Sequence, residues 1–193
     1  MNKTIPELVE RFVKGDNAAF TELVGRFQKK IYTLAYHLLG NHLDADEVVQ
    51  ETFVRVYNKR EDLKDVSYFS TFLVRVATNY AIDLLRKQKG HRGIAQDTAS
   101  LPGEIQLDLS QRVATPSQTF EQKRLMDEIN RALEFLPPKQ RLTAILHDVE
   151  GYSKPEIAEI FNCPQATVRS NLHIARMKLR KILRQRLRLK EQK

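Results

Sequence analysis

The sequence predicts an all-α protein made of two small helical domains that a flexible linker joins. Along most of its 193 residues, apolar side chains recur at three- and four-residue steps, as in helices that each bury one face. The seven glycines and seven prolines fall mostly at the boundaries of these segments. The helical period is lost between Gly90 and Pro116, where turn-forming residues are frequent. The chain is long enough for two small cores.

The first half of the chain is expected to form four helices. A short helix covers about Pro6 to Lys14. The next follows Asp16, whose carboxylate is suited to an N-cap, and ends at Gly40. A third helix extends from Asp44 to about Arg60, and a fourth follows Ser67 as its cap and continues to about Lys89. We assign residues 1–90 to an N-terminal domain.

The linker is assigned to residues 91–115 and the C-terminal domain to residues 116–193. A helix from Pro116 to about Leu136 is broken by Pro137-Pro138, and another covers about Lys139 to Val149. Ser153 and Glu156 then form the capping box of a short helix. A break at residues 162–164 leads into a long final helix.

Composition limits the functions that are plausible. The formal net charge of +8 suits a polyanionic partner such as nucleic acid. The single Cys163 and the five scattered histidines have no metal-ligand spacing, so we expect no metal and no cofactor. No apolar run approaches the length of a membrane span, and the N-terminus lacks the apolar core of a signal peptide. We therefore expect a cytoplasmic protein without membrane insertion.

Residues 153–178 have the pattern of a helix-turn-helix, which is a DNA-binding motif. Its second helix packs inward through Val168 and Leu172, and its opposite face is basic and rich in hydrogen-bonding groups. Such a face can read bases in the major groove and hold phosphates. The alternative is a surface hairpin with a solvated basic face. The residues expected to bind DNA here are Thr167, Arg169, Ser170, Asn171, His173, Arg176 and Arg180.

Two faces stand out in the first half. The helix that begins at Asp44 carries Asp46, Glu47, Gln50 and Glu51 on its outer side. An acidic patch in a basic protein indicates either a solvated helix N-terminus or a docking face for a basic protein partner. On the helix that follows Ser67, a stripe of amide, acidic and guanidinium groups lies near aromatic rings, an arrangement suited to unstacked bases.

Several motifs resemble the sigma-70 family, and in particular its extracytoplasmic-function (ECF) RNA polymerase sigma factors. Residues 44–53 (DADEVVQETF) resemble the most characteristic stretch of the family, and residues 14–20 and 69–79 resemble its flanking segments. In the second half, residues 136–141 (LPPKQR) and 163–170 (CPQATVRS) match the same family in the same order. The resemblance covers nearly the whole chain except the linker.

The resemblance implies roles for these residues. Asp46, Glu47, Gln50 and Glu51 would bind the clamp helices of core RNA polymerase, and the helix from Ala166 would read the promoter −35 element. The helix from Phe69 to Lys87 would melt and read the −10 element through Tyr68, Arg75, Thr78, Asn79, Asp83, Arg86 and Lys87. Many members of the family are held inactive by an anti-sigma protein, so an anti-sigma factor is a further candidate partner.

The function predicted is therefore that of a sigma factor, which binds core RNA polymerase and directs initiation at promoters with −10 and −35 elements. The alternative is a helix-turn-helix regulator that binds duplex DNA without polymerase, which would leave the acidic patch and the aromatic-basic helix without a role. An enzyme is not expected, because the sequence has no glycine-rich phosphate loop, metal-ligand set or nucleophile-base pair.

Overall fold

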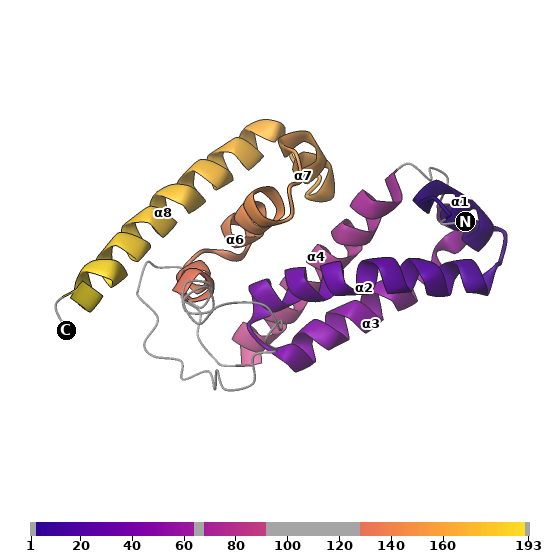
Figure 1. Ribbon diagram of the computed structural model, residues 1–193, viewed down its shortest axis with the longest axis horizontal. Coiled ribbons are helices and arrows are strands. Elements are labelled where there is room, and N and C mark those ends of the chain that lie inside the picture. The colour runs from indigo at the N-terminus through magenta and orange to yellow at the C-terminus, as the bar shows by residue number, and fades with distance from the viewer. Residues whose placement is uncertain (1–2, 64–67, 92–127, 192–193) are drawn as a thin grey trace.

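The computed structural model describes residues 3–63, 68–91 and 128–191, and every regular element in these ranges is a helix. The N-terminal half contains α1 (Ile5–Val13), α2 (Asn17–Leu39), α3 (His42–Asn58) and α4 (Phe69–His91), with the short 3-10 helix η1 (Arg60–Asp62) after α3. The C-terminal half contains a helical segment at 128–134, then α6 (Pro138–Ala144), the π-helix η4 (Ile145–Val149), α7 (Lys154–Ile160) and α8 (Gln165–Glu191) (Figure 1). The predicted all-α fold is confirmed.

The helix boundaries of the N-terminal half follow from local capping. The Asp16 carboxylate accepts hydrogen bonds from the amides of Ala18 and Ala19 at 2.9 and 3.2 Å, and Gly40 ends α2 in the left-handed region with φ of 72°. Both ends were predicted. Helix α3, in contrast, begins two residues before the predicted Asp44, because the Asn41 side chain caps it by accepting from the Leu43 amide at 2.9 Å.

In the C-terminal half, the predicted helix over residues 139–149 is present but changes its winding. It begins as α6 and ends as η4, where the Glu150 amide donates to the Ile145 carbonyl five residues earlier, at 3.0 Å. The predicted capping box of α7 is confirmed, with the Ser153 amide donating to Glu156 Oε2 at 2.8 Å. The predicted Ser67 cap, the linker from residue 92 and the helix start at Pro116 lie outside the described residues.

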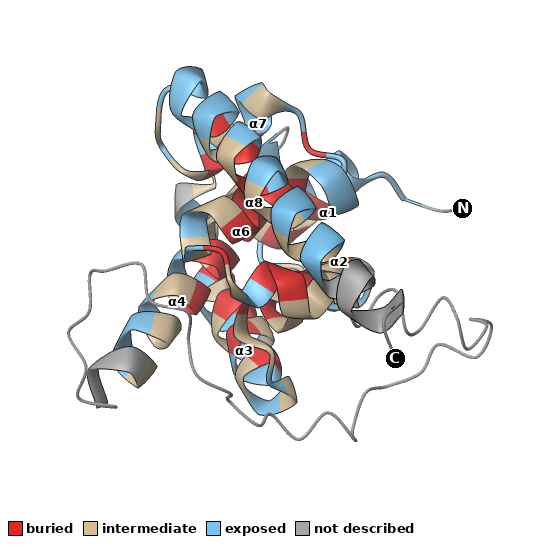
Figure 2. Cartoon of the chain, turned by 90° about the vertical axis from the view of Figure 1, so that its left-hand side faces the viewer, coloured by how far each residue is buried: buried red, intermediate tan, exposed pale blue. Residues whose placement is uncertain are grey.

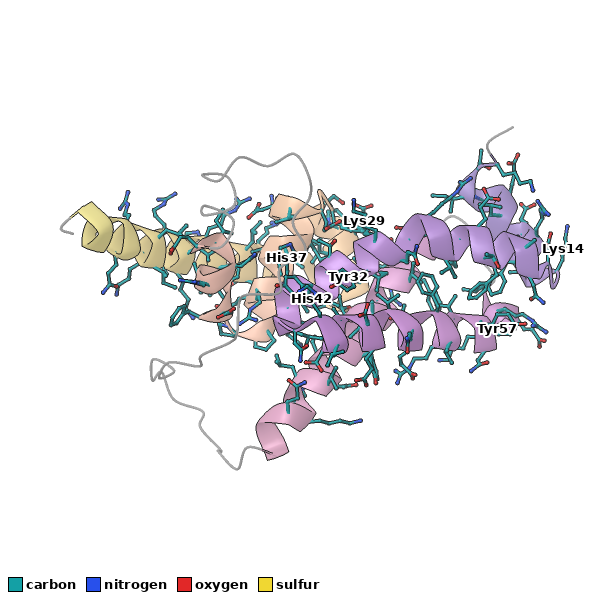
Figure 3. All side chains as sticks on the ribbon, turned by 60° about the horizontal axis from the view of Figure 1, so that its bottom comes forward. Lys14, Lys29, Tyr32, His37, His42 and Tyr57 are labelled. Carbon is teal, nitrogen blue, oxygen red and sulfur yellow. The ribbon has the colours of Figure 1, made fainter. Side chains whose placement is uncertain are left out.

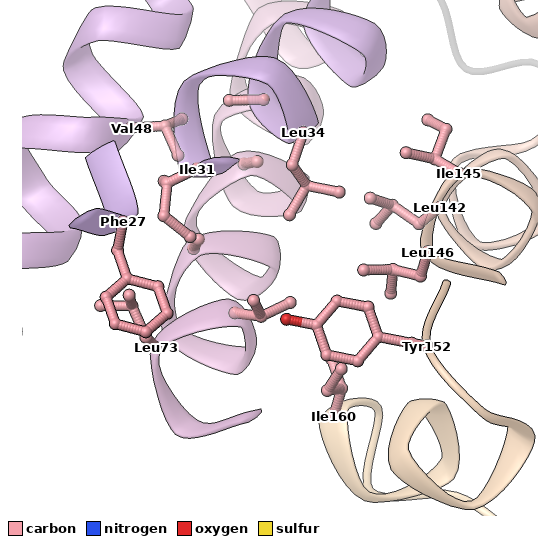
Figure 4. Close-up of a cluster of buried hydrophobic side chains, with 14 of the residues drawn as sticks. Phe27, Ile31, Leu34, Val48, Leu73, Leu142, Ile145, Leu146, Tyr152 and Ile160 are labelled. Carbon is pink, nitrogen blue, oxygen red and sulfur yellow. The ribbon is translucent and has the colours of Figure 1, made fainter. Parts of the chain in front are cut away.

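One apolar cluster runs through both halves of the chain. Buried residues of α2, α3 and α4 form its N-terminal part, and buried residues from α6 to α8 form its C-terminal part (Figure 2). Figure 4 shows where the two parts meet, with Leu142, Leu146 and Tyr152 facing Leu34 and the side chains around it. The two halves of the described chain are therefore packed against one another.

A buried arginine ties the halves together. Arg141 of α6 is only 8% exposed and donates to the carbonyl of Leu38, near the end of α2, at 2.6 Å. It also donates to the carbonyls of Glu134 and Leu136 at 2.5 and 3.5 Å. Burial lowers the pKa of Arg141 to about 10, so its guanidinium remains cationic at neutral pH. Because helix ends leave carbonyls without intrahelical partners, one cation here serves two helix ends.

Aromatic rings fix the junction between α2 and α3. The His42 ring stacks on Tyr36 with centroids 4.5 Å apart, and His42 Nδ1 is hydrogen-bonded to the Tyr32 hydroxyl. Figure 3 shows Tyr32 and His42 side by side where the two helices meet. At the other end of the same helix pair, the Phe20 ring of α2 lies edge-on to the rings of Phe53 and Tyr57 of α3, with centroids 6.2 and 5.2 Å apart. The orientation of α3, and therefore of its outer face, is set at both ends.

Candidate protein-docking and nucleic-acid-binding surfaces

The acidic patch predicted on α3 is present on its outer face. Asp46, Glu47 and Gln50 are exposed, and Glu51 is half-buried. The carboxylates are not simply solvated, because Glu47 Oε1 accepts a hydrogen bond of 2.5 Å from the Tyr80 hydroxyl of α4. Glu51 Oε1 accepts one of 2.6 Å from Arg55 Nε on the next turn of α3.

Two exposed aliphatic side chains extend this face, and sequence reasoning missed both. Leu43 is 79% exposed and Val54 is 53% exposed. At about 100° per residue, positions 43, 47, 50 and 54 of a helix fall within roughly 60° of one another. Leu43 and Val54 therefore flank Glu47 and Gln50 along one stripe of α3. The spacing was visible in the sequence, but apolar residues at helical spacing are more often core.

The predicted nucleic-acid stripe of α4 is only partly accessible. Asn79, Asp83, Arg86 and Lys87 are exposed, as is Tyr68 just before the helix. Arg86 and Asp83 form an exposed ion pair of 3.3 Å, which contributes little to stability. Arg75, in contrast, is engaged by α7: its Nη2 donates to the Glu159 carbonyl at 2.7 Å and lies 3.6 Å from the Glu159 carboxylate.

Thr78 does not belong to the accessible part of this stripe. Its side chain is fully buried, and its hydroxyl donates to the Arg75 carbonyl at 3.1 Å. It lines a small apolar hollow with Ala77, Ala81 and Leu142 of α6. With the two halves packed together, Thr78 is a packing residue, and the predicted contact with DNA would require α6 to move away from it. A family motif gives the position of a residue along its helix but does not show which other helix lies beside it.

The helix-turn-helix has the predicted division into a buried and an exposed face. Val168, Leu172 and Ala175 of α8 are buried, and Ile157 and Ile160 of α7 are buried against them. Asn162, in the turn between the helices, has a positive φ of 47°, which asparagine tolerates better than most residues. On the opposite face, Thr167, Arg169, Ser170, His173, Arg176 and Arg180 are exposed, and Asn171 is half-buried.

Arg176 differs from the other residues of this face because it is held by a partner. Its Nε and Nη2 donate to the two carboxylate oxygens of Asp148, in η4, at 3.1 and 2.5 Å. This bidentate pair raises the pKa of Arg176. With two of its donor nitrogens in use, the guanidinium has one terminal nitrogen free of Asp148. It is thus better suited to a phosphate than to a bidentate contact with a base.

The described residues offer neither a metal site nor a membrane span. Within those ranges, no group of three or more histidine, cysteine or acidic side chains is placed to hold a metal ion. None of the helices that the structure describes has the length and apolar character needed to cross a bilayer.

Comparison with known proteins places these surfaces in a family. The family model "Sigma-70 region 2" matches residues 23–91, and "Sigma-70, region 4" matches residues 126–179. The ECF RNA polymerase sigma factor SigW of Bacillus subtilis is 35% identical over 187 residues, which cover 95% of this chain and 99% of SigW. The ECF RNA polymerase sigma-E factor of Escherichia coli is 34% identical over 171 residues, 88% of each chain.

Two solved structures share the fold. CnrH, in complex with the cytosolic domain of CnrY, has a TM-score of 0.67 and 24% identity, covering 93% of this chain and 96% of that chain. The sigma factor RpoE of Bartonella quintana, in complex with the anti-sigma factor NepR, has a TM-score of 0.65 and 21% identity, covering 86% of this chain and 96% of that chain. The family models and the sequence relatives show that the chain belongs to the ECF sigma factors of the sigma-70 family, which are non-enzymatic proteins that bind core RNA polymerase and direct promoter recognition through regions 2 and 4.

Proposed function

We propose that each step of promoter recognition uses a different exposed face of the chain. The outer face of α3, with Asp46, Glu47, Gln50 and Glu51, docks on core polymerase. The exposed residues of α4 read the −10 element, and the N-terminal turns of α8 read the −35 element. The observation that carries this proposal is that an acidic face, an amide-bearing stripe and a basic face lie on three separate helices of one basic chain.

The residues of the α8 face divide into two groups by their distance from the start of the helix. Residues of a recognition helix that contact base edges lie near its N-terminus. Thr167, Arg169, Ser170 and His173 lie in the first turns of α8, and Asn171 is beside them. Arg176 and Arg180 lie about 16 and 22 Å from the start of the helix along its axis, at 1.5 Å per residue. We assign base reading to the first group and phosphate contacts to Arg176 and Arg180.

On α4, we infer that Tyr68, Asn79, Asp83, Arg86 and Lys87 contact the −10 element directly. Arg75 joins them only when its contacts with Glu159 are broken, and Thr78 joins them only when α6 moves away from it. Asn79 is the residue best suited to base recognition, because an exposed amide can both donate to and accept from one base edge.

Replacing Asn79 with alanine tests this assignment. Alanine makes no directed hydrogen bonds, and a good base contact contributes about 1–3 kcal/mol of discrimination. We expect Asn79→Ala to relax the preference at one −10 position by roughly tenfold or more, with core binding unchanged. In vitro transcription from promoter variants would measure the preference. An unchanged preference combined with a lower melting temperature would assign Asn79 a structural role instead.

The C-terminal domain, assigned to residues 116–193, is proposed to fold and bind DNA without the rest of the chain. Residues of α6, α7 and α8 provide it with buried apolar side chains of its own, including Ile157, Val168 and Leu172. We expect a fragment from Pro116 to Lys193 to be helical and to bind −35-type duplex weakly, with affinity that falls steeply as salt rises. Circular dichroism and fluorescence anisotropy would measure both. An unfolded fragment would contradict the boundary.

The place of action and one partner also remain proposals. We infer that the chain works in the cytoplasm, where its polymerase is. We also propose that an anti-sigma factor regulates it, in the way that RpoE of Bartonella quintana forms a complex with the anti-sigma factor NepR. Co-purification of the chain from its own cells would test for such a protein.

A further inference from the structure

Four side chains link the polymerase-docking face to the helix proposed to read the −10 element. These side chains form one network. The carboxylates of Glu47 and Glu51 of α3 lie at its two ends, and Arg55 of α3 and Tyr80 of α4 connect them. The Tyr80 hydroxyl donates to Glu47 Oε1 at 2.5 Å, and Arg55 Nε donates to Glu51 Oε1 at 2.6 Å. The Arg55 guanidinium carbon lies 4.6 Å from the centroid of the Tyr80 ring, which joins the two pairs.

Tyr80 is the member of this network that comes from α4, and its geometry suits a fixed donor. Its ring is half-buried between the two helices, so its position is set by packing. Its hydrogen bond to the Glu47 carboxylate raises the pKa of Tyr80 to about 12, so the hydroxyl proton is retained throughout the physiological range. Glu47 therefore has a hydrogen-bond donor that keeps its proton and whose position is fixed by packing.

The effect of such a donor on docking can be stated physically. A glutamate on an exposed helix face samples several rotamers, and fixing one of them when a partner binds costs free energy. A hydrogen bond to one carboxylate oxygen restricts these rotamers before binding. It leaves the second oxygen of Glu47 for a basic partner. Arg55, placed on the Tyr80 ring, restricts Glu51 in the same way.

We propose that Tyr80 is a positioning residue for polymerase binding, which holds Glu47 directly and Glu51 through Arg55 in the orientation that docks. This inference rests on the proposed role of the α3 face. Tyr80 need not touch polymerase or DNA. It acts through the carboxylates, and the contribution of its hydroxyl should therefore vanish when Glu47 is absent.

Tyr80→Phe is the informative variant, because it removes only the hydroxyl and keeps the ring on which Arg55 lies. The matched control is Tyr57→Phe, which also removes the hydroxyl of a half-buried tyrosine. The Tyr57 hydroxyl donates a hydrogen bond to Asn17 Oδ1 at 3.2 Å, away from the acidic patch. Binding of the full chain to core polymerase would be measured for both variants, for Glu47→Ala and for the Tyr80→Phe/Glu47→Ala double variant, each with its melting temperature.

We expect Tyr80→Phe to weaken core binding about fivefold, within the range for one hydrogen bond, while Tyr57→Phe binds as the unchanged chain does. Glu47→Ala should weaken binding further, and the double variant should be no weaker than Glu47→Ala alone. Wild-type affinity of Tyr80→Phe beside a weak Glu47→Ala would overturn the positioning role and leave the docking face intact. An equal loss in both backgrounds would also overturn it, since Tyr80 would then act independently of Glu47. Wild-type affinity of Glu47→Ala would instead count against Glu47 in the docking face.

Discussion

Reversing Glu47 and Glu51 to lysine is expected to abolish binding to core RNA polymerase while leaving the helix content unchanged. The two substitutions change the charge of one exposed patch by four units, and the second puts a cation beside Arg55, the ion-pair partner of Glu51. They also remove the acceptor of the Tyr80 hydroxyl. Like charges brought together at an interface cost several kcal/mol, so the affinity should fall by more than about 100-fold.

The control for this charge reversal must change the net charge equally in another place. Glu10 of α1 and Glu61 of η1 are both exposed and lie outside α3, and their reversal to lysine supplies the same four units. We expect the Glu10→Lys/Glu61→Lys chain to co-purify with core enzyme at the normal yield. If the Glu47→Lys/Glu51→Lys chain also did so, polymerase would have to bind a face other than α3.

The second large effect is expected at Arg141, and it concerns stability. Replacing this buried arginine with alanine leaves the carbonyls of Leu38 and Glu134 without their donor and removes a side chain that is 8% exposed. Buried acceptors without a partner cost about 1–3 kcal/mol each, so we expect a loss of roughly 2–4 kcal/mol. For a chain of this size, the melting temperature should fall by about 5–15 °C.

Calorimetry of the full chain would measure the change, and Arg180→Ala is the matched control. Arg180 is exposed on α8, so its removal should shift the melting temperature by less than about 2 °C. A shift that small for Arg141→Ala would mean that water replaces the guanidinium without loss. Arg141→Lys should not restore stability, because one ammonium lacks the planar fork that reaches carbonyls at two helix ends.

What the sequence predicted well is local. The Asp16 cap, the Gly40 end of α2 and the capping box of Ser153 and Glu156 each depend on residues within four positions of one another, and all were predicted. The protein family was also predictable, because the motifs of the sigma-70 family are continuous stretches of sequence such as residues 44–53. The start of α3 was missed by two residues because the residue that caps it, Asn41, lies before the acidic turn and was not identified from the sequence.

What the sequence did not predict depends on contacts between distant segments. The bond from Arg141 to the Leu38 carbonyl joins positions 103 residues apart, and the bond from Tyr80 to Glu47 joins positions 33 apart. The family resemblance gave Thr78 as a DNA-contacting residue but could not show that it lines a small hollow together with Leu142 of another helix. The change from α-helix to π-helix at η4 was not predicted either, because no residue of Ile145–Val149 indicates a π-helix.

The packing of the two halves against each other has a consequence for reach along DNA. Elements named −10 and −35 are about 25 base pairs apart, or about 85 Å of duplex at 3.4 Å per base pair. A compact chain of this length has a radius of gyration of about 16 Å, far too small for one closed body to touch both elements. Residues 92–127, in contrast, can span about 120 Å when extended.

Promoter reading thus requires the halves to part, which breaks the Arg141–Leu38 bond and uncovers the hollow beneath Leu142. The free energy of that opening is subtracted from the affinity for the promoter complex, so the strength of this internal contact sets how readily the factor engages.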